Sequence, residues 1–302
     1  MMDRFDAMTL LLTVVQEGNL SAAGRRLGMP LATVSRRLGE LEARLQARLL
    51  QRGSRRVTMT AAGEAYVAAA RRILDDLAEA ERAASGEYAE VQGELVVTAP
   101  VVFGRLHLLP VVTAFLRDNP RVNVRLVLSD RLLQLQEDHV DLALRIGPLP
   151  DSSRVAQRIG EVRRVLCASP GYLAEKGEPL HLHDLAAHDL VAFTTLGQPD
   201  RWDFGEGQSV AIFPRLSVNT AEAALDATME GLGITRVLSY QMQAAEREGR
   251  LKRVLLAQEP APFPVHLVHG AQGMVPRKLR AFLDFAVPML KARLSVQDLR
   301  GV

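Results

Sequence analysis

The first 60 residues carry arginines that could bind the phosphates and bases of a nucleic acid. Residues 1–58 contain ten arginines, no lysine and five acidic residues, a formal charge of +5. The rest of the 302-residue chain holds 27 of its 37 basic and 30 of its 35 acidic side chains, a formal charge of −3. A basic segment on a slightly acidic body indicates a polyanionic partner for that segment alone.

Side chains suited to base contacts lie on one face of a helix predicted after the tight turn at residues 28–30. The apolar residues Val34, Leu38, Leu41 and Leu45 recur at helical spacing and define its buried face. At about 100° per residue, the opposite face holds Ala32, Thr33, Arg36 and Glu40, flanked by Ser35 and Arg37. Such a helix is suited to the DNA major groove. A solvated face on an ordinary bundle helix is the alternative.

A short basic hairpin is predicted directly after this helix. Leu50, Val57 and Met59 are the apolar residues of two short strands, and residues 53–54 form the turn. The hairpin also carries three arginines, Arg52, Arg55 and Arg56. A wing that contacts the phosphate backbone or the minor groove explains this cluster better than a place in a protein interior.

Two further helices complete this segment. Phe5, Met8, Leu12 and Val15 fall at helical spacing and predict a first amphipathic helix that ends at residues 18–19. We expect Ser21 to cap a short second helix over residues 22–27.

The stretch over residues 19–63 resembles the DNA-binding region of LysR-type transcriptional regulators. The matching residues are Ala22, Ala23, Leu27, Gly28, Val34, Ser35, Arg36, Leu41, Glu42, Leu45, Leu49, Arg52, Thr60 and Gly63. The resemblance implies that Ser35, Arg36 and the residues that open the third helix contact bases or phosphates. The predicted DNA-binding residues are Ser21, Leu31, Ala32, Thr33, Ser35, Arg36, Arg37, Arg52, Arg55 and Arg56.

The chain departs from the family pattern at three positions. Pro30 and Leu31 stand where the family usually has Ser and Gln, so a capping oxygen and a polar base reader are missing. Leu31 can instead contact a thymine methyl group. Leu50 replaces a usual aromatic residue. The departure at Leu31 bears on the family's usual sequence preference and not on DNA binding itself.

A long helix is predicted from Thr60, its expected cap, to about residue 88. Six of its residues are separated by 4, 3, 4, 3 and 4 positions, the spacing of a two-helix seam: Tyr66, Ala70, Ile73, Leu77, Ala80 and Ala84. The resemblance implies that this helix dimerises. The alternative is a helix that packs on its own domain.

From residue 94 onward, short β-rich apolar runs alternate with helical stretches, which predicts parallel sheets covered by helices. The order resembles the effector-binding domain of LysR-type regulators, which is similar in fold to type 2 periplasmic binding proteins. The predicted fold is therefore α+β and multidomain. It comprises a winged helix-turn-helix (1–60), a linker helix (61–92) and a two-lobed α/β domain (93–302). The lobes are expected at 93–161 with 266–302, and at 162–265.

A ligand is expected in the crevice between these lobes, because ligands of open α/β sheets lie beyond the carboxyl ends of the strands. Gly104 is expected to begin a helix whose free N–H groups hold a carboxylate, with Arg145 adding charge, which suits a small organic acid. The predicted effector-binding residues are Pro100, Val101, Val102, Phe103, Arg145, Thr194, Thr195, Asn219, Gly231 and Ile234.

Other kinds of site find little support. His181, His183 and His188, with Asp184, are better explained as surface residues than as metal ligands. The sequence contains no G-x-S-x-G, P-loop or H-E-x-x-H motif, and we expect no metal, cofactor or enzymatic activity. Its lone cysteine, the lack of a signal peptide and the lack of an apolar run near 18 residues predict a cytoplasmic protein without a membrane partner.

The leading hypothesis is a transcription regulator that binds an interrupted palindromic promoter site as a homodimer or homotetramer. It would respond to a small-molecule effector, with RNA polymerase as a further candidate partner. The alternative is a small-molecule-binding protein or enzyme of α/β type whose N-terminal segment only oligomerises it.

Overall fold

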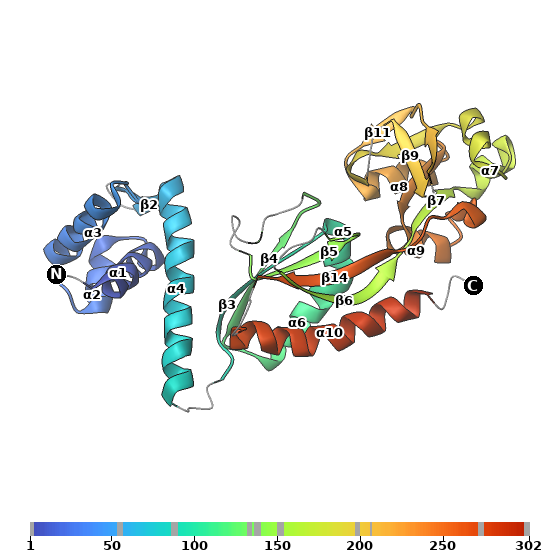
Figure 1. Ribbon diagram of the computed structural model, residues 1–302. Helices are drawn as coiled ribbons and strands as arrows, with labels where there is room; N and C mark the ends of the chain where they lie inside the picture. The colour runs from blue at the N-terminus through green and yellow to red at the C-terminus, as the bar shows by residue number, and fades with distance from the viewer. Residues whose placement is uncertain are drawn as a thin grey trace. The chain divides into compact units, whose positions relative to one another are not determined.

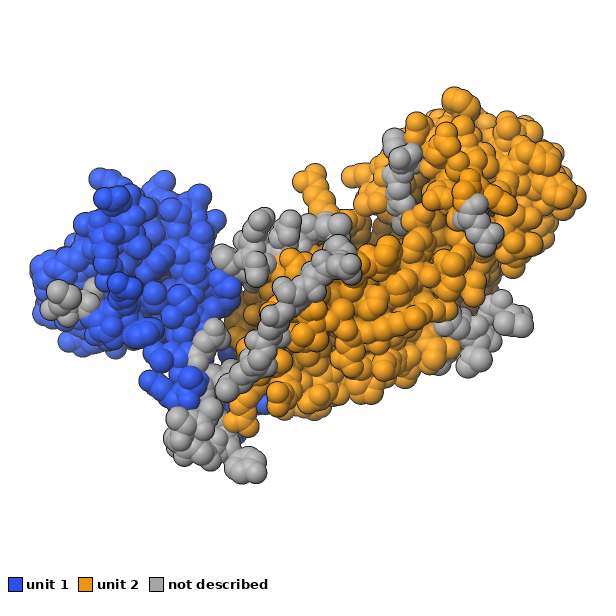
Figure 2. Space-filling model, viewed as in Figure 1, with its two compact units in different colours: residues 1–93 blue, residues 94–302 orange. Residues whose placement is uncertain are grey.

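The computed structural model describes residues 3–52, 57–85, 90–131, 135, 140–149, 154–196, 200–205, 207–270 and 275–298. The chain divides into two compact units, residues 1–93 and residues 94–302, which Figure 2 shows in different colours. Among the described residues, no helix is both long enough and apolar enough to cross a membrane.

The first unit is a winged helix-turn-helix followed by a long helix (Figure 1). Its elements are α1 (Arg4–Glu17), α2 (Leu20–Leu27), α3 (Leu31–Leu45), β1 (Leu50–Arg52), β2 (Val57–Met59) and α4 (Ala61–Ser85). The two strands pair antiparallel, with Leu50 opposite Met59. The predicted three helices, wing and linker helix are therefore confirmed as elements.

The core of this unit draws on every helix. Its buried residues are Ala7, Leu10, Leu11, Val14, Ala23, Val34, Leu38, Leu41, Leu49, Leu50 and Val67. The predicted apolar face of α1 is confirmed only in part: Leu12 and Val15 pack against the core, but its centre is formed by Ala7, Leu10, Leu11 and Val14, and Phe5 is 38% exposed. Three consecutive leucines at residues 10–12 support two overlapping stripes, and packing against α2, α3 and α4 centres the buried face on one of them.

The helix caps differ in part from the prediction. Asn19, not Ser21, caps α2, since its Oδ1 accepts a hydrogen bond from the Ala22 N–H at 2.7 Å. The Thr60 cap of α4 is confirmed, because its Oγ1 accepts from the Gly63 N–H at 2.9 Å. The same hydroxyl donates to the Arg48 carbonyl at 2.7 Å, which ties the start of α4 to the wing.

The wing is held from two sides where it leaves α3. The Glu42 carboxylate accepts hydrogen bonds from the Leu49 and Leu50 N–H groups at 2.8 and 3.1 Å. Gly63 of α4 approaches the same segment so closely that a Cβ on it would lie 1.9 Å from the Leu49 carbonyl oxygen. Only glycine permits this contact between a helix and the wing.

The second unit contains two five-stranded sheets, and the first has the strand order β4-β3-β5-β14-β6. Its strands are β3 (Gly93–Ala99), β4 (Val122–Leu128), β5 (Leu142–Ile146), β6 (Val155–Val162) and β14 (Phe263–His269). The helical segments of this lobe are α5 (Val101–Phe103), the π-helical η1 (Gly104–Leu108), α6 (Leu109–Asp118) and α10 (Arg277–Asp298). Helix α10 packs on β6 and α6 (Figure 1).

The second sheet has the order β11-β8-β12-β7-β13. Its strands are β7 (Arg164–Ala168), β8 (Leu190–Phe193), β11 (Leu216–Val218), β12 (Ile234–Leu238) and β13 (Lys252–Val254). This lobe adds α7 (Pro170–Lys176), α8 (Ala221–Met229), α9 (Ser239–Arg247) and the hairpin of β9 (Arg201–Gly205) and β10 (Gln208–Ala211). Short 3-10 turns η2 (Leu182–Ala187), η3 (Thr194–Leu196) and η4 (Leu256–Gln258) connect these elements.

Several expectations for this unit need correction. Both sheets are mixed rather than parallel, because β14 runs antiparallel to β5 and β6, and β7 runs antiparallel to β12 and β13. Residues 263–265, expected in the second lobe, pair with β6 in the first sheet. Three strands, β6, β9 and β13, were not anticipated. The chain passes from the first sheet to the second at residue 163 and returns before residue 263. The two strands that follow these crossings, β7 and β14, run antiparallel to their neighbours, so each sheet is mixed.

Aromatic rings from both lobes meet beside the crossing strands. Phe103 lies 4.7 Å from the His107 ring and 5.2 Å from the ring of Tyr240 in α9, measured between centroids. Burial, aided by the charge of Arg293, lowers the pKa of His107 to about 4. His107 is therefore a neutral member of an apolar contact at neutral pH.

Replacing Gly63 by alanine is expected to destabilise the first unit. The added Cβ would clash with the Leu49 carbonyl, and relieving the clash should cost about 2 kcal/mol. Urea unfolding of the full chain, followed by circular dichroism, measures this. Gly39→Ala in α3 is the control, because a Cβ there meets no atom within 4 Å and should slightly stabilise the helix. Equal effects of the two substitutions would contradict the close contact.

His107 should make the second unit less stable in mild acid. Its pKa is about 4 in the folded chain against 6.5 in the unfolded one, so the unfolded chain binds the proton first as the pH falls. As the pH falls from 6.5 to 4, this group should lower the free energy of unfolding by up to about 3 kcal/mol. His107→Gln should flatten the decline of the unfolding free energy in that window, whereas His183→Gln, at an 80% exposed side chain, should not. Parallel curves for all three proteins would refute this role.

Candidate DNA-binding face and effector pocket

The predicted DNA-binding face of α3 points away from the core of the first unit. Val34, Leu38 and Leu41 are buried on one side of the helix. On the other side, Ala32 and Arg36 are exposed, and Leu31 is 49% exposed at the first turn. Thr33, Ser35 and Arg37 are half-buried on the flanks. The burial of one face therefore determines which side chains a groove would meet.

The charges on α3 are already engaged with neighbours. Arg36 forms an ion pair with Glu40 one turn later, and both side chains are largely exposed. Arg37 directs its Nη1 toward the Met29 sulfur at 3.7 Å. An exposed ion pair of this kind contributes little to stability, so Arg36 can exchange Glu40 for a phosphate or a base edge at small cost.

Other predicted DNA contacts are described only in part. Ser21 is exposed on α2, although it does not cap that helix. Arg52 ends β1, but its side chain lies outside the described residues, as do Arg55, Arg56 and the turn between the strands. The contribution of these three arginines stays a prediction.

The predicted dimer seam on α4 divides into two parts. Tyr66 packs against the core of the first unit, and Ala70 has only 1% of its surface exposed. Ile73 is 42% exposed, Leu77 is half-buried and Ala80 is exposed. The side chain of Ala84 lies outside the described part of α4. The first two positions thus follow the alternative of a helix packed on its own domain, because α4 lies against α1 there.

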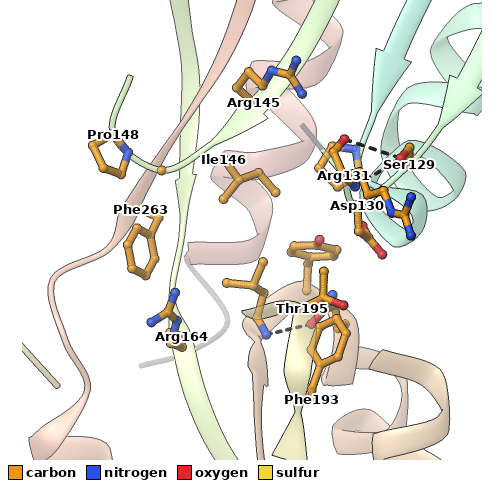
Figure 3. Close-up of a pocket in the computed structure, with 15 residues that line it drawn as sticks. Ser129, Asp130, Arg131, Arg145, Ile146, Pro148, Arg164, Phe193, Thr195 and Phe263 are labelled. Carbon is orange, nitrogen blue, oxygen red and sulfur yellow. Dashed lines mark hydrogen bonds between the residues drawn. The ribbon is translucent and has the colours of Figure 1, made fainter. Parts of the chain in front are cut away.

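A pocket of about 330 Å³ lies in the second unit between the two sheets (Figure 3). Three of the predicted effector-binding residues line it: Pro100, Arg145 and Thr195. Its other lining residues are Ser129, Asp130, Arg131, Ile146, Gly147, Pro148, Arg164, Phe193, Leu238, Tyr240, Gln241 and Phe263. Both lobes contribute, and most of these residues lie at or just beyond strand ends.

Seven predicted effector residues do not line this pocket. Phe103 and Ile234 are fully buried and Val102 nearly so, because they are core residues of their lobes. The Thr194 hydroxyl donates to the Val218 carbonyl at 3.1 Å and so bridges β8 and β11. The remaining three are Val101, Asn219 and Gly231.

The predicted carboxylate site at Gly104 was wrong. The helical segment begins at Val101, and the Gly104 N–H donates to the Pro100 carbonyl at 2.7 Å. The protein's own Asp130 accepts from the Val101 N–H at 3.0 Å. An internal carboxylate thus occupies the position expected for a ligand.

Sequence reasoning missed the residues that give the pocket its chemistry. Ser129, Asp130 and Arg131 follow β4, so the strand-end rule that selected Pro100 would also have selected them. Arg164 and Phe263 lie on strands that begin where the chain crosses between the sheets. No local pattern marks a crossing point, since it depends on which strands pair.

Two arginines at or next to the pocket, Arg164 and Arg236, have lowered pKa values. Burial lowers the pKa of Arg164, while Asp203 opposes that shift. Burial, followed by the charge of Arg164, lowers the pKa of Arg236 to about 9. The pKa of the Tyr240 phenol is raised by burial, so its hydroxyl stays protonated at neutral pH. The site combines positive charge with aromatic walls.

No metal site emerges from the described ranges, in which no group of three or more His, Cys, Asp or Glu side chains could hold an ion. The His181 and His183 rings stack at 5.2 Å between centroids, and Asp184 accepts hydrogen bonds from the Leu180 and His181 N–H groups. Burial raises the pKa of the Cys167 thiol to about 12, so the thiol is unreactive.

Two domain families match the chain in the order that the structure shows. The bacterial regulatory helix-turn-helix domain of the LysR family matches residues 5–64, and the LysR substrate-binding domain matches residues 89–291. An HTH-type transcriptional regulator of Xanthomonas campestris pv. campestris is 34% identical over 97% of this chain and 90% of its own length. The regulator CrgA of Neisseria meningitidis serogroup C is 33% identical over 94% of this chain and 96% of its own.

Solved structures agree with these matches. The structure of CrgA from Neisseria meningitidis has a TM-score of 0.60 at 31% identity and covers 94% of this chain and 98% of that one. The full-length Vibrio cholerae virulence activator AphB has a TM-score of 0.58 at 28% identity and covers 95% and 99%. The helix-turn-helix unit, the two-lobed unit and relatives that match over nearly the whole length together show that the chain belongs to the LysR family of transcriptional regulators, which are not enzymes.

Proposed function

We propose that this LysR-family regulator binds an interrupted palindromic promoter site as a homo-oligomer through the outward face of α3 and the wing. The observation that carries this assignment is the burial of Val34, Leu38 and Leu41, which turns Ala32 and Arg36 outward. Arg36 forks onto guanine or binds phosphate, and Leu31 offers an apolar contact to a thymine methyl group. The wing arginines add phosphate or minor-groove contacts.

The described contacts support α4 as the oligomerisation element only over its later part. Ile73, Leu77 and Ala80 lie beyond Tyr66 and Ala70 on the helix and keep exposed surface for a partner helix. Pairing two DNA-binding units matters because one winged unit makes few contacts, whereas two at fixed spacing read a two-fold site.

The pocket provides the regulatory input. An effector that contacts both lobes favours one lobe arrangement, and subunit packing then changes the spacing of the two DNA-binding units and the DNA bend. We infer a small organic acid as effector, RNA polymerase as a partner at the promoter, and the cytoplasm as the compartment. The competing hypothesis of an enzyme with an oligomerising N-terminus has no support in the family assignment.

Arg36→Ala is expected to weaken DNA binding at least tenfold, because it removes a charged contact to the groove. The probe is a duplex that the wild-type protein selects from a random-sequence pool, and the readout is a gel-shift titration at several salt concentrations. If Arg36 binds phosphate, the slope of the logarithm of the affinity against the logarithm of the salt concentration should also become less steep by about one.

The matched control for this experiment is Arg117→Ala, which removes an exposed arginine from α6 in the second unit. It should leave both the affinity and the salt dependence unchanged. Equal affinities for wild type, Arg36→Ala and the control would exclude α3 as the reading helix.

Ile73→Glu is expected to break the helix pairing, because it places a charge on the exposed apolar seam. Light scattering after gel filtration should show the mass of the assembly halved, with a parallel loss of affinity for the selected duplex. Arg71→Glu, on an exposed position beside the seam, is the control that should keep the mass. An unchanged mass for Ile73→Glu would place the subunit interface elsewhere.

A further inference from the structure

Two arginines lie side by side near the pocket: Arg236 is buried, and Arg164 is half-buried with its Nε fully covered. Arg164 of β7 pairs with Leu238 of β12, and Arg236 of β12 pairs with Leu166 of β7. Paired residues in an antiparallel ladder share a face, so both guanidinium groups lie on the same side of the sheet. The positive charge of Arg164 lowers the pKa of Arg236, as expected for two guanidinium groups that lie close together.

Arg236 has its own structural role in the second lobe. It is only 5% exposed, donates a hydrogen bond to the Asp203 carbonyl at 2.8 Å, and lies over the rings of Trp202 and Phe204 at 5.3 and 5.8 Å. These contacts hold a permanent positive charge beneath the β9–β10 hairpin. Arg236 therefore raises the positive potential at the pocket without lining it.

Arg164 lines the pocket and is incompletely satisfied. Its Nε is buried without a hydrogen-bond acceptor, and its guanidinium lies 4.6 Å from the centroid of the Phe263 ring. Asp203 attracts it, and none of the ion pairs found among the described residues includes it. Leaving a buried N–H of a charged group without an acceptor is costly, so this side of the pocket favours an anion.

The remaining walls define the rest of the ligand. Phe193, Leu238, Tyr240 and Phe263 contribute apolar and aromatic surface, and the volume of about 330 Å³ is at the lower end for ligand pockets. Figure 3 shows Asp130, Arg131 and Arg145 on the side away from Arg164, so charges of both signs lie at that end and Arg164 lies at the other, next to Phe263. An inorganic anion would leave the apolar walls unfilled.

We propose that the effector is a small carboxylate with a compact apolar body, and that Arg164 is its anchor. The carboxylate accepts hydrogen bonds from Arg164, and the body contacts Phe193, Tyr240 and Phe263. This inference rests on the proposed function, because it names the ligand class of the pocket that function requires.

The test is a thermal-shift assay of the full chain with acids and their uncharged amides. The pairs are benzoate with benzamide, phenylacetate with phenylacetamide, and hexanoate with hexanamide, and acetate and inorganic phosphate serve as anions without an apolar body. At least one of the larger acids should raise the Tm by about 5 °C at a hundred times its Kd, while its amide has no effect. Stabilisation by phosphate or acetate alone, or by no acid, would overturn the proposal.

Substitutions locate the effect within the protein. Arg164→Gln should weaken the binding of the active acid at least tenfold, since it removes a charged hydrogen bond. Without ligand, this variant should be about as stable as the wild type, because a charged group whose buried Nε has no acceptor has been removed. Arg158→Gln, at an exposed arginine paired with Glu161 outside the pocket, should keep the wild-type response. An undiminished response in Arg164→Gln would refute the anchor.

The same preparations also report on DNA binding. If the chain binds its selected duplex in a salt-dependent manner but no acid shifts the Tm, the ligand class is wrong and the proposed function stands. If acids bind but no duplex is retained, the proposed function fails and the ligand class survives.

Discussion

The burial of one face of α3 is the constraint on which the DNA-binding assignment depends. Val34, Leu38 and Leu41 are held in a core with α1 and the start of α4, so the helix cannot rotate without exposing them. The side chains opposite are thereby turned outward. Glu42 and Gly63 extend this control to the wing, the first by accepting two backbone hydrogen bonds and the second by allowing α4 to approach the Leu49 carbonyl.

A different constraint shapes the second unit. The chain passes from the first sheet to the second at residue 163 and returns to the first before residue 263. Residues near these two points therefore lie close to both lobes. Arg164 and Phe263 lie there and face the pocket. A ligand at this position contacts the segments about which the lobes are joined, which is where a small molecule can bias their arrangement.

The sequence predicted much of this correctly, for reasons that are local. Helix periodicity identified α3 and α4, and the Thr60 cap follows from the preference of hydroxyl side chains for helix starts. Predictions failed where two local solutions were equally good. Ser21 and Asn19 are both competent caps, and the leucines of α1 support two stripes, so only packing distinguishes them.

By itself, the sequence determined the order of the domains, the type of most elements and the side of α3 that is turned away from the core, because these depend on periodicity, capping and charge along short stretches. The tertiary structure alone decided which residues form the pocket, that Asp130 accepts from the Val101 N–H at the helix start, and that the Arg164 Nε is buried without an acceptor among the described residues. These features depend on pairing between strands far apart in the sequence, such as Val268 with Ala143, 125 residues away, and no local pattern encodes such pairings.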